Sequence, residues 1–271
     1  MVSLGPLGKR HCTYRCAFCY VQGSFPRYPA ASIETVLHFL KDNAAHFSII
    51  YVSGDTDSFA RPGADRGIAL LSRLLELDKD VLFTTRAVFT DSERRRMEGL
   101  AAQYSGRQRL LIGCVSVSQL HHPNLEPTPI PSVEARIDQL SWLKASGIVS
   151  VLTIRPLIPM IPASEYVEIA EGASHAANVI IGGNWYVDDD GVIARETTKA
   201  LNGIRMPEPD QFGPLYFSTR PEPAWFTYRH PQAESALLDF SQRTGVPFFM
   251  GSEAAVASIR QQMGRLIDLA V

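Results

Sequence analysis

Short apolar runs alternate along this chain with longer amphipathic segments, and this alternation limits the fold more than any other feature. The apolar runs are rich in branched or aromatic residues and are bounded by Gly, Asp or Pro, as strands are. The runs predicted as strands are 2–9, 48–53, 80–85, 110–118, 149–155 and 179–187. The segments predicted as helices are 33–47, 64–77, 92–104, 133–145 and 164–173. Because such alternation specifies parallel strands with right-handed crossovers, the sequence predicts an α/β fold, a partial (β/α)6 TIM-like barrel.

Two of the predicted helices carry specific end signals. Thr90 and Glu93 have the spacing of a capping box at the start of helix 92–104. Gly147 follows helix 133–145, where a residue in the left-handed conformation commonly ends a helix. These local signals support the helix boundaries.

The region from Asp188 to Arg229 interrupts the alternation. It holds five prolines between residues 207 and 223, with aromatic side chains among them. Because aromatic residues argue against disorder, we expect an irregular cover over the mouth of the barrel. A helix at 231–244, a short strand at 246–250 and a helix at 252–269 are expected to close the domain. We therefore expect a barrel core at 1–187 and an extension at 188–271 within the same domain.

Composition narrows the class of protein. The chain has 271 residues, 45% hydrophobic residues and a formal net charge of −2. This charge does not favour binding through many phosphate contacts, so a nucleic-acid partner is not expected. No apolar run is long enough to span a bilayer, so no membrane partner is expected. Three of the four cysteines are clustered, which suits metal binding in a reducing compartment, and we expect a cytoplasmic protein.

The clustered cysteines are the main functional signal. Cys12, Cys16 and Cys19 fall within eight residues as CxxxCxxC, with Phe18 before the last cysteine and Tyr20 after it. Three thiolates can hold three irons of a 4Fe-4S cubane and leave the fourth iron open to exogenous chemistry. A zinc knuckle with His11 as fourth ligand is the alternative. A knuckle normally presents two ligand pairs from a small separate module, which favours the cluster here.

The CxxxCxxC spacing with its two aromatic residues resembles the cluster loop of the radical S-adenosylmethionine (radical SAM) superfamily. The resemblance implies that the amino and carboxylate groups of S-adenosylmethionine chelate the open iron. It also implies that an electron, from a donor such as flavodoxin or ferredoxin, splits the sulfonium to give a 5'-deoxyadenosyl radical. With four cysteines in total, the chain cannot fully ligate a second cluster.

Residues at the predicted strand ends match positions at which this family contacts S-adenosylmethionine. The resemblance implies that the segment Ser53, Gly54 and Asp55 meets the methionine amino group, and a tight Asp-rich turn is the alternative. Arg86 is placed to hold the methionine carboxylate, although an ordinary surface arginine fits equally well. Arg155 would reach either that carboxylate or the substrate.

Residues of strand 110–118 are further candidates for contact with the cofactor or the substrate radical. Cys114, Ser116 and Ser118 share one parity, so their side chains point to the same side. The two serines resemble the polar residues by which the family contacts the ribose. Cys114 is a candidate hydrogen-atom donor that quenches a substrate radical, with a buried core cysteine as the alternative. The segment 153–159 at the end of the fifth strand, together with Glu126 and Arg136, is nearest in pattern to the spore photoproduct lyase-like branch.

Four residues at the end of the last predicted barrel strand or beyond it are candidates for substrate binding. They are Asn184, Tyr186, Asp188 and Tyr228. The carboxylate suits an amine or guanidine and the aromatic rings suit stacking. The alternatives are a solvated turn for the acidic run and simple packing for the aromatic residues.

These observations predict a radical SAM enzyme with a 4Fe-4S cluster and S-adenosylmethionine as cofactors. The expected substrate is a small polar metabolite or natural-product intermediate, from which hydrogen abstraction leads to epimerisation, dehydrogenation, rearrangement or elimination. A nucleic-acid photoproduct lyase-like repair enzyme is the second possibility, weakened by the charge balance and by the lack of an Arg- and aromatic-rich groove. A non-catalytic metal-binding protein is the third.

Overall fold

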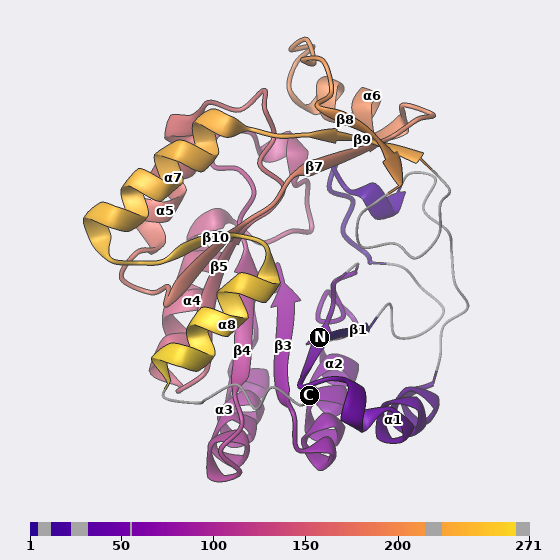
Figure 1. Ribbon diagram of the computed structural model, residues 1–271, viewed down its shortest axis with the longest axis vertical. Coiled ribbons are helices and arrows are strands. Elements are labelled where there is room, and N and C mark those ends of the chain that lie inside the picture. The colour runs from indigo at the N-terminus through magenta and orange to yellow at the C-terminus, as the bar shows by residue number, and fades with distance from the viewer. Residues whose placement is uncertain (5–11, 23–31, 55, 215–223, 264–271) are drawn as a thin grey trace.

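The computed structural model describes residues 1–4, 12–22, 32–54, 56–214 and 224–263. Its main sheet has parallel strands in the order β1-β2-β3-β4-β5-β6-β10. They are β1 (Val2–Leu4), β2 (Ile49–Val52), β3 (Asp80–Thr85), β4 (Leu111–Ser116), β5 (Val149–Ile154), β6 (Val179–Gly182) and β10 (Phe248–Met250). Strands β1 to β6 curl into a half-barrel, which confirms the predicted partial barrel (Figure 1). Strand β10 extends this sheet beside β6.

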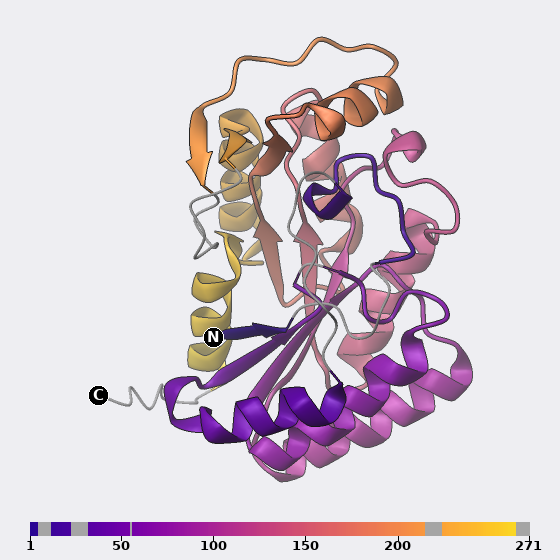
Figure 2. The same ribbon diagram turned by 90° about the vertical axis from the view of Figure 1, so that its right-hand side faces the viewer.

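Helices cover the convex side of this sheet (Figure 2). Their apolar side chains form one buried cluster with the outward side chains of the strands, such as Phe83, Val115 and Leu152. The helices on the convex side that contribute to it are α1 (Ile33–Asp42), α2 (Ala64–Leu74), α3 (Asp91–Gly106), α4 (Val133–Ala145), α5 (Ala163–Ala173) and α7 (Pro231–Thr244). The predicted capping box at Thr90 and Glu93 is present, and Gly147 has a positive φ of 76°.

The predicted helix 33–47 is shorter than expected. Helix α1 ends at Asp42, and a 3-10 turn (Ala44–His46) follows it. The amide of Asn43 donates to the carbonyl of Phe39 at 2.8 Å. This side-chain bond to a terminal carbonyl favours the end of the helix at that point.

The concave side of the half-barrel has an apolar half and a polar half. Helix α8 (Ser252–Gln262) packs Ala255, Val256 and Ile259 against inward side chains of the strands, such as Ile112 and Val151. At its far end, Arg260 donates to Asp80 at 2.8 Å. Helix α8 therefore fills the half of the barrel near the amino ends of the strands. Polar side chains of the same parity as the inward apolar ones, such as Thr84, Ser116 and Thr153, line the other half, toward the carboxyl ends.

A second, antiparallel sheet stands beyond the carboxyl ends of the barrel strands (Figure 1). Its order is β7-β9-β8, from β7 (Trp185–Asp188), β9 (Ala224–Tyr228) and β8 (Gln211–Pro214), and α6 (Val192–Ala200) lies against β7. The region is therefore an ordered sheet with a helix where an irregular segment was expected, and it lies beyond the barrel mouth, as expected. The strand predicted at 179–187 is wrong, because it splits into β6 and β7, which belong to different sheets.

The break between β6 and β7 lies at Gly183, against the side chain of Arg155. A Cβ atom at Gly183 would lie 2.8 Å from Nε of Arg155, so a larger residue there would have to displace the arginine side chain from the end of β6. The remaining parts of two predicted elements, strand 2–9 beyond Leu4 and helix 252–269 beyond Met263, fall outside the described residues. Among the residues described, no helix is both long and apolar enough to cross a membrane.

Candidate active site

Three separate elements hold the segment that carries the cysteines, here called the cluster loop (residues 12–22). The backbone N–H of Ala17 donates to the carbonyl of Leu125 at 2.9 Å, and the Thr197 hydroxyl of α6 donates to the carbonyl of Ala17 at 3.1 Å. The Thr13 hydroxyl donates to the carbonyl of Arg61 at 3.1 Å. Figure 2 shows this loop in indigo beneath α6. The loop is thus fixed at the carboxyl ends of the barrel strands.

Aromatic contacts join the cluster loop to the second sheet. The ring of Tyr20 makes edge contacts with Tyr186 of β7 and Trp225 of β9, each with centroids 6.5 Å apart. Asp188 pairs with Trp225 in this sheet, and strand alternation puts it on the same face as Tyr186. This face of the second sheet therefore looks toward the cysteines.

Burial and local charge act differently on the three cysteines. Cys16 is 5% exposed, whereas Cys12 and Cys19 are partly exposed. Burial raises the pKa of the Cys16 thiol, and the nearby Arg86 guanidinium opposes this shift. Burial and the Asp57 carboxyl raise the pKa of Cys12, while backbone hydrogen bonds from Asp57 and Tyr14 lower it. Metal binding must therefore release protons from these thiols.

The donor set of the cluster loop suits a 4Fe-4S cubane. Thiolates are the soft ligands that iron–sulfur clusters use. Each thiolate of a cubane binds a different iron, so the sulfurs need not converge on one point. Within the described residues, no three or more His, Cys, Asp or Glu side chains are arranged to hold a single metal ion. His11, the fourth ligand of the zinc alternative, lies outside the described residues, and the three cysteines fit the cubane.

The segment after β2 is tied to the end of β3 through Asp57. The buried carboxyl of Asp57 accepts from the backbone N–H of Arg86 at 2.6 Å, from the Thr85 hydroxyl at 2.9 Å and from the N–H of Phe59 at 2.9 Å. The last of these is the Asx turn that sequence reasoning kept as the alternative. Ser53 adopts a positive φ of 68° and accepts a hydrogen bond from the Ser58 N–H at 3.1 Å.

The residues predicted in this segment are only partly described. Gly54 follows Ser53 at the end of β2, as expected, and Asp55 lies outside the described residues. A non-glycine residue with positive φ is uncommon and is often found at functional sites. The conformation of Ser53 therefore marks this turn as a constrained part of the site.

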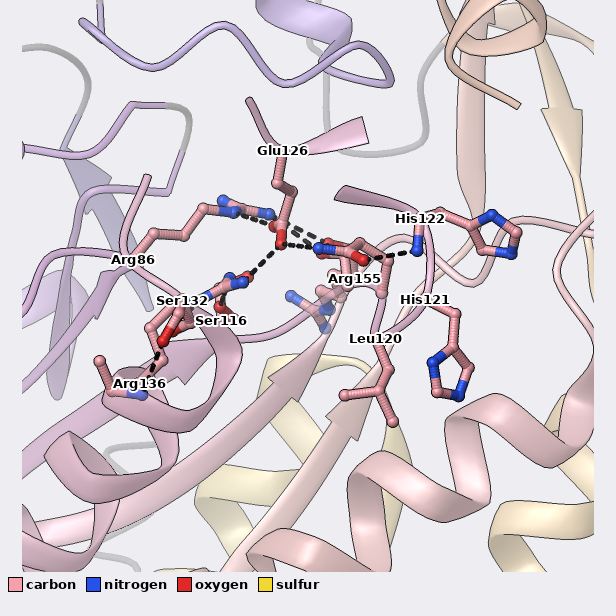
Figure 3. A network of polar contacts seen from close by, with 12 residues as sticks. Arg86, Ser116, Leu120, His121, His122, Glu126, Ser132, Arg136 and Arg155 are labelled. Atoms are coloured by element: carbon pink, nitrogen blue, oxygen red, sulfur yellow. Dashed lines mark hydrogen bonds and ion pairs between the residues drawn. The ribbon is translucent and has the colours of Figure 1, made fainter. Parts of the chain in front are cut away.

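A buried network of charges lies beside the cluster loop (Figure 3). Glu126 accepts from Nε of Arg86 and from Nη2 of Arg136, both at 2.7 Å. Arg136 also donates from Nη1 to the carbonyl of Ser116 at 2.6 Å. The side chains of Glu126 and Arg136 are 0% and 1% exposed, respectively. Sequence reasoning noted Glu126 and Arg136 only as part of a resemblance and missed this network.

The two arginines keep Glu126 ionised. Burial alone raises the pKa of a carboxyl, yet Arg136 and Arg86 hold the pKa of Glu126 below its usual range. Arg86 uses further donors within the protein, from Nη2 to the Ser118 hydroxyl at 3.1 Å and to the carbonyl of Arg155 at 3.3 Å. Ser118 also donates to the carbonyl of Arg155. The predicted cofactor residues Arg86, Ser118 and Arg155 thus lie together and bind one another.

The side chain of Arg155 runs toward β6 and α8. Its Nε donates to the carbonyl of Gly182 at 2.8 Å, and its Nη1 donates to the Ser252 hydroxyl at 3.1 Å. No carboxylate within the described residues forms an ion pair with it. Arg155 is therefore a cation at the rim of the polar half of the barrel.

Cys114 lies where the polar and apolar halves of the concave side meet. It is 1% exposed and belongs to the apolar cluster under α8. Burial raises the pKa of its thiol to about 11, although hydrogen bonds with the neighbouring hydroxyls of Thr153 and Thr84 act to lower it. Ser116, the next residue of the same parity, is also buried. Cys114 therefore lies deeper in the barrel than the arginines.

The predicted substrate residues are divided between the two faces of the second sheet. Tyr186 and Asp188 share the face toward the cluster loop, whereas Tyr228 lies on the opposite face and packs on Trp185 with centroids 5.1 Å apart. Oδ1 of Asp188 accepts from the N–H of Ile193 at 3.0 Å. Oδ2 of Asp188 and Oδ1 of Asn184 are buried and have no hydrogen-bond partner among the described residues.

The hydrogen bond from Thr197 of α6 to the cluster loop is expected to stabilise the protein and its metal site. Thr197→Val keeps the shape of this buried side chain but removes the donor to the Ala17 carbonyl, so we expect the free energy of unfolding to fall by about 1 kcal/mol. We also expect a chelator to remove the metal faster. Thr198→Val is the control, since it makes the same change one position along α6. Equal behaviour of the two variants in urea unfolding and chelation would contradict this role.

Comparisons with known proteins agree with the site. The family model of the radical SAM superfamily matches residues 9–173. No curated protein matches the sequence. A spore photoproduct lyase complexed with dinucleoside spore photoproduct has a similar fold, with a TM-score of 0.61 and 13% identity over 90% of this chain and 75% of that chain.

Two further solved structures are similar at comparable identity. The methyltransferase TsrM from Kitasatospora setae has a TM-score of 0.57 and 12% identity over 93% of this chain and 53% of that one. SuiB from Streptococcus suis, bound to S-adenosylmethionine, has a TM-score of 0.56 and 11% identity over 89% and 48%. These likenesses concern the fold. The family match, which spans more than half of the chain and includes the three cysteines, shows that this protein belongs to the radical SAM superfamily.

Proposed function

We propose that this protein reductively cleaves S-adenosylmethionine at a 4Fe-4S cluster and abstracts hydrogen from a small polar metabolite or natural-product intermediate. The observation that carries the proposal is the cluster loop. Its Cys12, Cys16 and Cys19 are held by three elements at the carboxyl ends of parallel strands, where reactive groups collect in such barrels. Epimerisation, dehydrogenation, rearrangement and elimination all remain open as the outcome.

The chain's own residues would bind and orient the cofactors. When bound, the cluster and S-adenosylmethionine supply hydrogen abstraction from an unactivated carbon. The three thiolates would hold the cluster, and the rings of Phe18 and Tyr20 would shield it from water. Ser53 and Gly54 would present backbone groups to the methionine amino group, as Asp55 would with its carboxylate.

Residues of the barrel rim would hold the rest of S-adenosylmethionine. Ser116 and Ser118 lie on the strand end proposed to contact the ribose. Arg155, which has no carboxylate partner among the described residues, suits the methionine carboxylate or an anionic group of the substrate. Arg86 was proposed for the same carboxylate, but two of its nitrogens already bind protein groups.

The face of the second sheet toward the cluster loop is the proposed substrate surface. Oδ2 of Asp188 and Oδ1 of Asn184 are buried acceptors with no partner among the described residues, and such atoms usually have one. Hydroxyl or amino groups of a small polar substrate would supply the missing donors. Tyr186 would pack beside them. Tyr228, on the other face, supports the sheet instead of contacting the substrate.

A repair enzyme that acts on nucleic acid is the second candidate. The observation in its favour is the fold likeness to a spore photoproduct lyase complexed with dinucleoside spore photoproduct. The net charge of −2 weighs against it, because binding to nucleic acid depends strongly on basic side chains. The third candidate is a metal-binding protein without catalysis.

Anaerobic purification separates these candidates. The proposal predicts a brown protein with about four irons per chain. With a strong reductant it should convert S-adenosylmethionine to 5'-deoxyadenosine and methionine, even without substrate. A protein that holds one zinc and no iron would reject the proposal, and an iron–sulfur protein that never cleaves S-adenosylmethionine would favour a binding role. Faster cleavage with a dinucleoside photoproduct would support repair.

The role of Cys114 can be tested separately. Because the residue is 1% exposed within an apolar cluster, we expect Cys114→Ala to lower stability by about 1 kcal/mol and to leave the product distribution unchanged. Urea unfolding and product analysis in deuterated solvent check this. A product that loses solvent deuterium in the variant would instead assign Cys114 as the hydrogen-atom donor, since thiol hydrogens exchange with solvent.

A further inference from the structure

The guanidinium of Arg86 lies beside the cluster loop. Its Cζ is 5.5 Å from the centroid of the Phe18 ring, and Phe18 lies between Cys16 and Cys19 in the chain. A cation at this place lies beside the segment that carries two of the cluster ligands.

Four contacts prevent the Arg86 side chain from turning away. Its Nε donates to Glu126 at 2.7 Å, and its Nη2 donates to Ser118 at 3.1 Å and to the carbonyl of Arg155 at 3.3 Å. Its backbone N–H is bound to Asp57 at 2.6 Å. Glu126 is itself held by the buried Arg136 at 2.7 Å. The position of the charge is thus built into the fold.

The charge of Arg86 is weakly screened because the side chain is largely buried. The side chain of Arg86 is 17% exposed and that of Glu126 is 0% exposed, so water and salt screen the charges less than at the surface. Glu126 stands between two arginines and cannot neutralise both. Asp57, whose carboxyl accepts from the backbone N–H of Arg86 at 2.6 Å, is the negative group beside Cys12. Arg86 is therefore the fixed cation beside Phe18, between the positions of Cys16 and Cys19 in the chain.

We infer that Arg86 is a positioning residue that raises the reduction potential of the cluster bound by the neighbouring cysteines, with Glu126 fixing its place. In this role it is not a ligand for the carboxylate of S-adenosylmethionine. The inference rests on the proposed function. One electron from the external donor makes the cluster more negative by one charge, and a fixed cation stabilises that reduced form. No covalent bond forms or breaks at Arg86.

Potentiometric titration of the iron-loaded protein, followed by electron paramagnetic resonance, tests this role. Arg86→Gln removes the charge and keeps a donor to Glu126. At a fixed applied potential we expect it to lower the ratio of reduced to oxidised cluster at least tenfold, which is about 59 mV for a one-electron couple. Arg86→Lys keeps the charge and should stay within about threefold of the wild type. Arg109→Gln is the matched control.

The control removes an equal charge at the opposite end of the sheet. Arg109 precedes β4 and donates to Asp78 at 2.9 Å, on the surface. Its variant should leave the potential unchanged. If Arg86→Gln fails to keep the cluster, Glu126→Gln is the second variant: its amide oxygen still accepts from Nε of Arg86, so the arginine stays in place, and loss of the negative charge should raise the potential.

Two results would overturn the inference. The first is an unchanged potential in Arg86→Gln together with a tenfold loss of affinity for S-adenosylmethionine, which would make Arg86 a carboxylate ligand. The second is a lowered or unchanged potential in Glu126→Gln. Absence of iron from the wild-type protein would instead reject the proposed function, so the two failures are distinguishable by the iron content.

Discussion

Cys16→Ser is expected to remove the cluster and, with it, reductive cleavage of S-adenosylmethionine. Cys16 is the most buried cysteine of the cluster loop. A serine hydroxyl is a harder ligand than a thiolate and does not ionise at neutral pH, so it is a poor substitute for iron. Loss of residues that only support a metal ligand commonly reduces activity about 10–100-fold, and loss of the ligand itself should exceed 100-fold. Iron content and 5'-deoxyadenosine formation measure the effect.

A matched cysteine variant separates this loss from general damage. Cys114→Ser makes the same substitution at a buried cysteine outside the cluster loop and should keep its iron. The circular dichroism of the metal-free Cys16→Ser protein should match that of the metal-free wild type, because the loop's anchors at Ala17 do not involve the thiol. A Cys16→Ser protein that keeps its iron and its activity would contradict the assignment of this ligand.

Glu126→Leu is expected to be the most destabilising of the substitutions considered. The carboxylate lies between the guanidiniums of Arg86 and Arg136, at 2.7 Å from each, and is 0% exposed. Its removal leaves two buried arginines without their shared partner, and breaking a buried pair in this way costs about 3–5 kcal/mol. Urea unfolding of the metal-free protein measures this loss.

The pH dependence of the same variant gives a second readout. The two arginines hold the pKa of Glu126 below its usual range, so the ionised form is favoured in the folded state. The resulting stability is present above the ordinary pKa of a glutamate and is lost as the pH falls through the lower, folded value. The difference between wild type and Glu126→Leu should therefore shrink in acid.

An exposed glutamate provides the control. Glu76 pairs with Arg73 and Lys41 at the surface, where such pairs contribute about 0–1 kcal/mol. Glu76→Leu should change stability by no more than that. If Glu126→Leu lost no more than Glu76→Leu, the buried network would have no role in holding the site together.

Most of the barrel could be predicted because its signals are local. Helices α4 and α7 have the predicted bounds because both carry clear end signals: Ser132 and Gly147 flank α4, and α7 begins at Pro231 and is followed by Gly245. The second sheet could not be predicted in this way. Strands β8 and β9 are short and depend on pairing with each other and with β7 across the chain. The boundary between β6 and β7 was hidden because Trp185 and Val187 continue the apolar pattern.

The candidate site likewise has one part that could be predicted from the sequence and one part that could not. The cysteine motif is contiguous in sequence and could be found directly. The network around Glu126 joins β3, α4 and the segment after β4, and such contacts are set by the tertiary fold. One signal was available: Arg136 falls in the apolar stripe of α4 with Val133, Leu140 and Leu143. A charged residue in such a stripe indicates a buried partner.

One iron of the cluster is expected to have no protein ligand and to bind S-adenosylmethionine. Magnetic resonance of the reduced protein, with S-adenosylmethionine labelled in its amino and carboxylate groups, tests this expectation directly. Hyperfine coupling of those labels to the cluster is the expected result, because chelation places both groups on the iron that no cysteine holds. A reduced cubane that shows no coupling to either label, with a protein side chain on its fourth iron, would contradict the account.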